Sequence, residues 1–492
     1  MSNNGNNTKQ AFWIALGSLF SFGFTIVSSM ILSRYFPKED YGTYKQVMYV
    51  YSTMLTVFTL GLPKAFSYFL PRVAENQAKS LIKKLTNLFF ILGGIFSLIL
   101  FFASDYIAGF LKNPDLTYAL KLFSPVPLLI LPTMGLEGIL ATFRMTKFMT
   151  VYTVATRTGM LLCVALPVMF FGGDYIHAVM GFVAASFVSF ILALYFKYYP
   201  VRNKRNDLVE ITYKEIFKFS LPLLTASIWG ILISSADQFF ISRYFGTEVF
   251  AEFSNGSLEL PFVSMIVGAT AAVLSPVFSK MSHEKLDPQN EIFPIWKSVF
   301  EKSAMLIYPL LIYTWVFADV IMIVLYGSQY ENSAIYYRIK TIVNFFTLIV
   351  FTPLIINIGK VKHYSNVHMY GAIVLIMAEF ITVKTIHSPY ILVAVSVLCQ
   401  LGRIYFMLRL VASFFQYNIY QLFPLKLISK IVLPSFFILL LEYYLLVVSW
   451  NFSPFLVLCI SFPIYTVVLY FLSLKFGLDY LSIVKPLYKK GD

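Results

Sequence analysis

The chain has 492 residues, of which 58% are hydrophobic and only 13% are charged. A water-soluble protein carries about 25% charged residues, so this composition excludes a soluble globular protein. The net charge is +14. Because no basic patch lies in a soluble domain, we assign this excess to loops beside anionic lipid headgroups and expect no nucleic-acid partner.

Apolar runs of about 20 residues recur from end to end and predict an all-α polytopic membrane protein with about fourteen transmembrane helices. A transmembrane barrel would instead show alternating segments of about ten residues, which are absent. The predicted spans lie near 12–33, 43–68, 85–104, 118–141, 150–171, 176–196, 217–241, 250–275, 299–325, 339–358, 366–384, 389–410, 428–449 and 453–474. Within the fourth span, Pro125, Pro127 and Pro132 predict a break, because each proline removes a helix hydrogen bond.

A tetrapeptide repeat indicates that the spans form two related halves. Ser33–Phe36 recurs as Ser242–Phe245, 209 positions later, and each copy ends a long apolar run. Five residues after each Arg stands a Glu, Glu39 or Glu248, and a second apolar run follows. We therefore predict two pseudo-symmetric six-helix lobes. The predicted organisation is an N-terminal lobe at 1–196, a basic cytoplasmic linker at 197–216, a C-terminal lobe at 217–410, and two further spans with a tail at 411–492.

The distribution of basic residues predicts the topology. Of the 38 Lys and Arg residues, nine lie on loops that follow odd-numbered spans, and nearly all others lie at the termini or on the opposite loops. This asymmetry places both termini in the cytoplasm. The three cysteines lie within apolar runs, and no Cys/His cluster has metal-ligand spacing, so we expect no metal site and no catalytic residues.

Several short motifs resemble one transporter superfamily. The stretch Arg34–Tyr44 ends the first span, Gly61–Pro63 ends the second, and Asp237 lies near the outer end of the seventh. These motifs and the span pattern resemble the multidrug/oligosaccharidyl-lipid/polysaccharide exporter superfamily, and within it the bacterial polysaccharide-unit flippases. The resemblance implies alternating-access translocation of a polyprenyl-diphosphate-linked oligosaccharide to the outer leaflet of the plasma (inner) membrane, for surface polysaccharides such as O-antigen or exopolysaccharide. It also implies no enzymatic activity, no cofactor beyond a coupling proton or Na⁺, and membrane lipids and polysaccharide polymerase machinery as partners.

A diphosphate cargo needs a cationic cavity, and arginine suits it because its planar fork binds phosphate oxygens bidentately. Arg157 lies inside the fifth span, where it either faces a cavity or snorkels to the headgroups. Lys64 and Arg144 lie near inner span ends, either in the cavity or on a solvated face. Arg34 and Arg243 either pair with the glutamates that follow them or form an outer collar for the diphosphate.

Acidic residues within spans are candidates for ion coupling, because desolvation favours the protonated acid. Asp237 occupies the position that the resemblance implies, and Glu259 lies near the middle of the eighth span. Other readings remain open. They are a peptidoglycan-precursor flippase, a multidrug/ion antiporter of the same superfamily, and an integral-membrane polysaccharide polymerase or ligase. Two spans beyond twelve argue against the antiporter, and short outer loops without clustered histidines argue against the enzyme.

Overall fold

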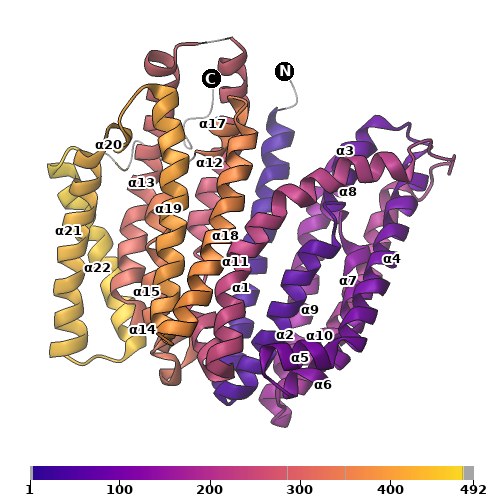
Figure 1. Ribbon diagram of the computed structural model, residues 1–492, viewed down its shortest axis with the longest axis horizontal. Helices are drawn as coiled ribbons and strands as arrows, with labels where there is room; N and C mark the ends of the chain where they lie inside the picture. The colour runs from indigo at the N-terminus through magenta and orange to yellow at the C-terminus, as the bar shows by residue number, and fades with distance from the viewer. Residues whose placement is uncertain (1–3, 285, 350, 479, 481–492) are drawn as a thin grey trace. The chain divides into compact units, whose positions relative to one another are not determined.

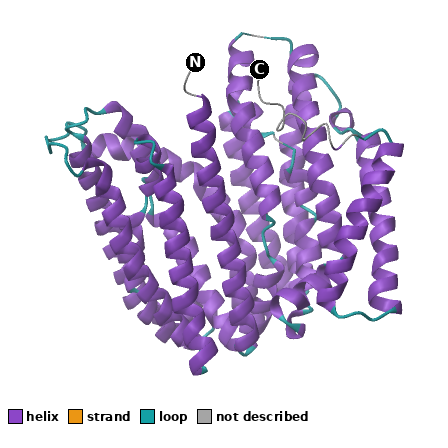
Figure 2. Ribbon diagram, turned by 180° about the vertical axis from the view of Figure 1, so that it is seen from behind, coloured by secondary structure: helices purple, strands orange, loops and turns teal. Residues whose placement is uncertain are grey.

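The secondary structure of the chain is helical. The computed structural model describes residues 4–284, 286–349, 351–478 and 480 (Figure 1). No strand occurs among these residues (Figure 2), which confirms the all-α prediction. Helices pair every interior backbone N–H and C=O within one segment, and this is the condition for crossing a bilayer.

Ten of the described helices are long and apolar enough to cross a membrane, and two sharply bent helix pairs raise the number to twelve if each pair is one span. The predicted count of fourteen is not confirmed. The predicted second span is interrupted at Leu60 and Gly61, which have φ of 49° and 69°. The predicted tenth span is divided into three short helices. Neither is one continuous helix, so neither is counted among the ten or twelve.

The chain divides into two compact units, Met1–Ala251 and Glu252–Asp492, with the division inside helix α11. Unit 1 contains α1 (Asn4–Tyr35), α2 (Lys38–Phe58), α3 (Pro63–Phe69), α4 (Ala78–Phe102), α5 (Ser104–Leu111), α6 (Asp115–Phe123), α7 (Pro125–Ile130), α8 (Leu136–Thr142), α9 (Thr146–Phe171), α10 (Tyr175–Tyr198) and most of α11 (Tyr213–Gly256). Unit 2 contains α12 (Pro261–His283), α13 (Phe293–Val316), α14 (Ala318–Tyr326), α15 (Ser333–Thr341), α16 (Asn344–Thr347), α17 (Thr352–Asn357), α18 (Val361–Thr385), α19 (Pro389–Phe415), α20 (Ile419–Leu422), α21 (Leu425–Tyr443) and α22 (Pro454–Lys475).

The same packing pattern occurs in both units. In unit 1, α9 packs on α10, α5 on α6, α6 on α10, and α3 on α8. In unit 2, α18 packs on α19, α14 on α15, α15 on α19, and α12 on α17. These are the contacts expected if both units share one fold. The superposition of 12–196 on 217–410 stays a prediction.

The repeated tetrapeptide precedes a backbone break in both places. Pro37 separates α1 from α2 with φ −54° and ψ 152°. Gly246 stands 209 residues later and interrupts α11 with φ 85° and ψ 176°. The repeat therefore marks a helix–break–helix element that the chain uses twice.

Residues 202–212 of the predicted linker lie outside helices and contact α4 and the turn before it, whereas the two ends of the predicted segment belong to helices. The Lys204 ammonium lies 2.9 Å from the Glu75 carboxylate, and the Lys84 ammonium donates to the Ile211 carbonyl at 2.6 Å. The Asn76 amide also donates to the Asp207 carboxylate. The segment is thus held against unit 1, and helix α11 follows it from Tyr213.

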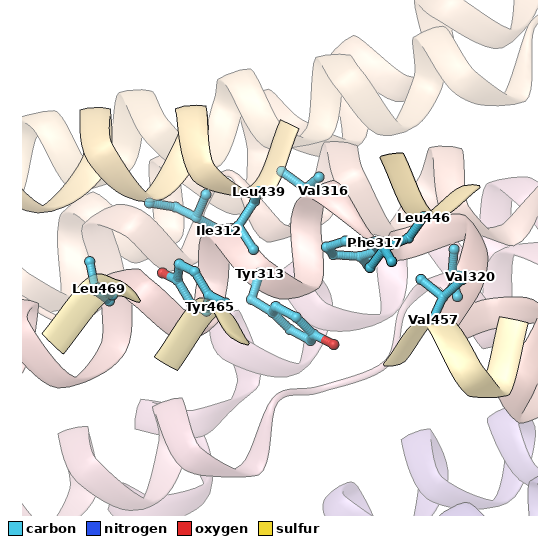
Figure 3. Packing of buried hydrophobic residues seen from close by; sticks show 10 residues of the cluster. All are labelled: Ile312, Tyr313, Val316, Phe317, Val320, Leu439, Leu446, Val457, Tyr465 and Leu469. Carbon is cyan, nitrogen blue, oxygen red and sulfur yellow. The ribbon is translucent and has the colours of Figure 1, made fainter. Parts of the chain in front are cut away.

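The last two helices, α21 and α22, pack against α13 and α14 of the same unit (Figure 3). The buried cluster consists of Ile312, Tyr313, Val316, Phe317, Val320, Leu439, Leu446, Val457, Tyr465 and Leu469. In lipid, helices associate through close packing and interhelical hydrogen bonds, because the tails are as apolar as the side chains. This interface has both, since the Tyr465 hydroxyl donates to the Pro309 carbonyl at 3.1 Å.

Arg338 stabilises the 74° bend between α13 and α14. Its guanidinium donates to the carbonyls of Trp315 and Val316 at 3.1 and 3.0 Å, which are groups left without helix partners at the end of α13. It also pairs with Asp319 at 3.1 Å, and the Tyr443 hydroxyl of α21 donates to the same carboxylate. Arg338 therefore has a structural role at a helix break.

Candidate functional site

Unit 1 encloses a cavity of about 560 Å³ that contains two of the predicted cationic residues. Its walls are the end of α2, α3, the broken fourth span, α9 and α10. Lys64 on α3 and Arg157 on α9 line it, together with Glu137 on α8. Tyr51 and Tyr152 add phenol groups to the same wall.

The break in the fourth span shapes the cavity floor. After α7, a single 3₁₀ turn, η2 (Leu131–Thr133), leads to Gly135, which has φ 80°. A Cβ on Gly135 would lie 2.0 Å from the Phe66 ring, and one on Gly138 would lie 2.6 Å from the Ser67 hydroxyl. Glycine is therefore required at 135 both for its backbone conformation and for the close approach of α8 to α3. The proline triplet correctly predicted this break.

Arg157 lies eleven residues after the start of α9, which is roughly 16 Å along the helix axis. Its side chain is exposed and lines the cavity. Within the part of the chain that the structure describes, neither Arg157 nor Lys64 makes a hydrogen bond or an ion pair. Two cations of unit 1 are thus available to an anionic ligand.

Lys197 is a third cation beside this cavity, and the sequence analysis did not identify it. It is 0% exposed, and its ammonium donates to the Pro132 carbonyl at 2.7 Å and approaches the Thr86 hydroxyl at 3.4 Å. The rings of Phe66 and Phe89 lie 4.7 and 5.7 Å from it. Lys197 therefore fastens the broken span to α10 through its bond to the Pro132 carbonyl.

The other predicted cations lie outside the residues that line this cavity. Arg34 is exposed at the end of α1, and Arg144 is exposed after α8 with φ 56°. Arg243 of α11 donates to the Phe110 carbonyl, and its guanidinium lies 4.7 Å from the Phe110 ring. In the described residues it forms no ion pair with Glu248, which follows the break in α11.

Unit 2 has a cavity of about 410 Å³ between equivalent elements. It lies among the α11–α12 connection, α15, α16 and α19, as the first lies among α2, α3, the fourth span and α10. Glu259 and Lys340 are its charged residues, and Asn344 and Gln400 add amides. The candidate coupling residue Glu259 is thus exposed in this cavity, whereas Asp237 of α11 is only 2% exposed.

A buried amide network joins α2, the α5–α6 loop and α11 in unit 1. The Asn113 amide donates to Thr43 Oγ1 at 2.9 Å and to Gln46 Oε1 at 2.6 Å. The Gln46 amide donates in turn to Ser242 Oγ at 2.8 Å. Ser242 begins the second copy of the repeat, so one serine of the motif has a structural reason to be there.

Two units with the same packing pattern, helices long enough to cross a membrane, and a cavity lined by Arg157 and Lys64 are the features of a polytopic membrane protein with an anion-binding cavity. The chain belongs to the polysaccharide biosynthesis protein family, whose model matches residues 8–282. With that family it belongs to the multidrug/oligosaccharidyl-lipid/polysaccharide exporter superfamily. The succinoglycan relative and the structural neighbours are named as transport proteins or flippases, not as enzymes.

The relatives agree with this assignment. The succinoglycan biosynthesis transport protein ExoT of Rhizobium meliloti is 21% identical over 330 residues, which cover 66% of this chain and 64% of ExoT. The match therefore spans less than two thirds of that relative. The uncharacterized membrane protein MJ1068 of Methanocaldococcus jannaschii is 23% identical over 355 residues, 68% of this chain and 69% of its own.

Two solved structures share the fold. The lipid II flippase MurJ in an inward closed conformation matches with a TM-score of 0.73 at 15% identity, covering 94% of this chain and 98% of MurJ. An inward-facing multidrug resistance transporter of the MATE family matches with a TM-score of 0.64 at 12% identity, covering 83% and 99%. The flippase match thus includes more of this chain than the multidrug transporter match.

Proposed function

We propose that this protein is a flippase that moves a polyprenyl-diphosphate-linked oligosaccharide from the cytoplasmic to the outer leaflet of a bacterial plasma membrane by alternating access. The observation that carries the proposal is the pair of unpartnered cations, Arg157 and Lys64, in the unit 1 cavity. Membership of a polysaccharide biosynthesis family supports a saccharide cargo. The name of ExoT, a succinoglycan transport protein, supports the same class.

The residues of the unit 1 cavity would make different kinds of contact with the cargo. The Arg157 guanidinium offers parallel N–H groups to two phosphate oxygens, and Lys64 adds a mobile point charge. Lys197 is buried and is not among the residues that line the cavity, so we assign it no contact with the cargo. Tyr51 and Tyr152 also line the same space. Arg34, Arg144 and Arg243 lie outside this cavity and remain candidates for later contacts along the transport path.

The proposed energy source is a proton or Na⁺ that binds a carboxylate. The structure places Glu259 in the connection between α11 and α12 rather than in the middle of a span, and Asp237 within α11. Glu259 is the better placed candidate, because it lines the unit 2 cavity together with Lys340. Asp237 is the alternative, because it is buried on α11. We expect the amide variant of the true coupling residue to lose its dependence on the ion gradient in reconstituted vesicles, while the amide variant of the other keeps it.

The peptidoglycan precursor is a second candidate cargo, because the lipid II flippase matches 94% of the chain. Both cargoes carry a diphosphate, so the cationic cavity does not distinguish them. Deletion of the gene followed by lipid analysis does. We expect polyprenyl-diphosphate-linked repeat units to accumulate on the inner leaflet, with loss of a surface polysaccharide and continued growth. Accumulated peptidoglycan precursor with arrested growth would assign the second cargo. If neither lipid accumulates, the flippase proposal is contradicted.

We predict that both termini are cytoplasmic, because basic residues concentrate on one set of loops. Reporter fusions test this prediction. Fusions at Gly173 and Gly327 should report an outside location, and fusions at Asn203 and His283 an inside location. Reversed signals at either pair would contradict the topology.

A further inference from the structure

The carboxyl group of Glu442 is buried in the interface between α21 and the rest of unit 2. Glu442 is 8% exposed and lies on the buried stripe of α21 with Ile431, Ser435 and Leu439. Spacings of three and four residues place these side chains on one helix face. Among the described residues, neither carboxyl oxygen of Glu442 has a hydrogen-bond partner.

Two tyrosine hydroxyl groups close to this carboxyl are hydrogen-bonded to other residues. Tyr313 of α13 and Tyr465 of α22 are the titratable side chains that face it. The Tyr313 hydroxyl bonds with Ser461 Oγ at 3.0 Å, and the Tyr465 hydroxyl donates to the Pro309 carbonyl at 3.1 Å. Their further neighbours are the Cys459 thiol and the Tyr480 phenol. Each of these groups is neutral in its usual form.

The nearby charges are already balanced by each other. Arg338 of α15 pairs with Asp319 of α14, and that pair takes the hydroxyl of Tyr443, the residue after Glu442. No cation among the described residues is within ion-pair distance of Glu442. An ionised carboxylate in this place would be a buried charge without a partner, which membrane interfaces strongly disfavour.

We propose that Glu442 is a proton-binding site of this transporter, and that its protonated form holds α21 against α13 and α22. Loss of the proton leaves a charge that only water can stabilise, so it favours separation of α21 from its neighbours. The helix continues from Glu442 into a π-helical turn, η6 (Tyr444–Ser449), a rare conformation that is often found at functional sites. The inference does not depend on which cargo the protein carries.

A lipid-soluble carbodiimide detects a protonated carboxyl group in an apolar site. The acid proton moves to a carbodiimide nitrogen while the carboxylate oxygen bonds to the central carbon, and the O-acylisourea rearranges to a stable N-acylurea. The product contains all atoms of both reactants, so the peptide gains the mass of one carbodiimide. Full-length protein in nanodiscs of neutral lipid would be treated with dicyclohexylcarbodiimide from about pH 6 to pH 9 and digested for mass spectrometry.

We expect modification at Glu442 to fall by at least about tenfold across this range as the proton dissociates. Glu442→Gln should remove that modified residue, whereas the matched variant Glu379→Gln, which changes another buried glutamate of unit 2, should leave it. A Glu442 that is unmodified at every pH would overturn the proposal, and so would modification that does not change with pH.

Hydrogen exchange separates a proton switch from a merely structural carboxyl group. After correction for intrinsic rates, amides of residues 431–449 in the wild-type protein should exchange faster as the pH rises. Glu442→Gln cannot ionise, so its exchange should show no such pH dependence. Equal pH profiles in the two proteins would contradict a role for this proton, and the wild-type profile remains informative if the variant folds poorly.

Discussion

Arg157→Ala is expected to lower export of the polysaccharide by about 10- to 100-fold, while the protein stays folded in the membrane. A hydrogen bond to a charged group contributes about 1.5–3 kcal/mol, and Arg157 offers such bonds to the proposed diphosphate from a position without other partners. Arg157→Lys should recover only part of the activity, because an ammonium keeps the charge and loses the bidentate geometry. The measurement is surface polysaccharide in a deletion strain that expresses each variant at matched membrane levels.

Lys147→Ala is the matched control for this experiment. Lys147 is an exposed cation near the start of the same helix and is not among the residues that line the cavity. It should export at the wild-type rate. Wild-type export by Arg157→Ala would mean that the side chain only snorkels, and the cationic site would then have to be sought at Lys64, Arg34, Arg144 or Arg243.

Gly135→Ala is expected to destabilise the protein by roughly 2–5 kcal/mol and to reduce transport with it. The left-handed backbone accounts for about 1–2 kcal/mol of this loss. The rest comes from the overlap of the new methyl group with the Phe66 ring, which lies 2.0 Å from its position. Because the same ring lies against Lys197, moving it also disturbs this buried residue. Thermal unfolding of the purified protein in detergent measures the effect.

Gly172→Ala separates the two causes. Gly172 also has a positive φ, 62°, but a Cβ there would meet no atom within 4 Å. It should lose only the backbone contribution, about 1–2 kcal/mol. If both variants unfold at the same temperature, the close packing of α8 on α3 does not contribute to stability.

The sequence predicted the features that depend on local chemistry. An arginine inside an apolar run is costly in lipid, so residue type and position were enough to select Arg157. Pro132 likewise identified the break that forms the cavity floor. Lys197 could not be selected in this way. It stands next to tyrosines at a span end, where a lysine is usually solvated. Its burial depends on contacts with the Pro132 carbonyl and with rings of α3 and α4, which are distant in sequence.

The predicted span count of fourteen was not confirmed because breaks in the backbone could not be predicted from residue type. The break at Leu60 depends on a left-handed conformation that a leucine rarely adopts, so residue type did not predict it. Arg243 likewise had a plausible partner in Glu248 by spacing alone. The break at Gly246 separates the two, and the guanidinium instead reaches a carbonyl of α5 that is distant in sequence.

The buried amide network also constrains the order in which the protein is assembled. Gln46 and Ser242 are 196 residues apart, so their hydrogen bond closes a loop that contains almost all of unit 1. During synthesis, α2 leaves the ribosome long before α11. In that interval Gln46 Oε1 can accept from Asn113, which also donates to Thr43, but the Gln46 amide group still lacks Ser242. Closing long loops is slow and entropically costly, so this contact belongs to the last steps of unit 1 assembly. Ser242 of the second repeat thus completes a network that α2 and the α5–α6 loop can begin without it.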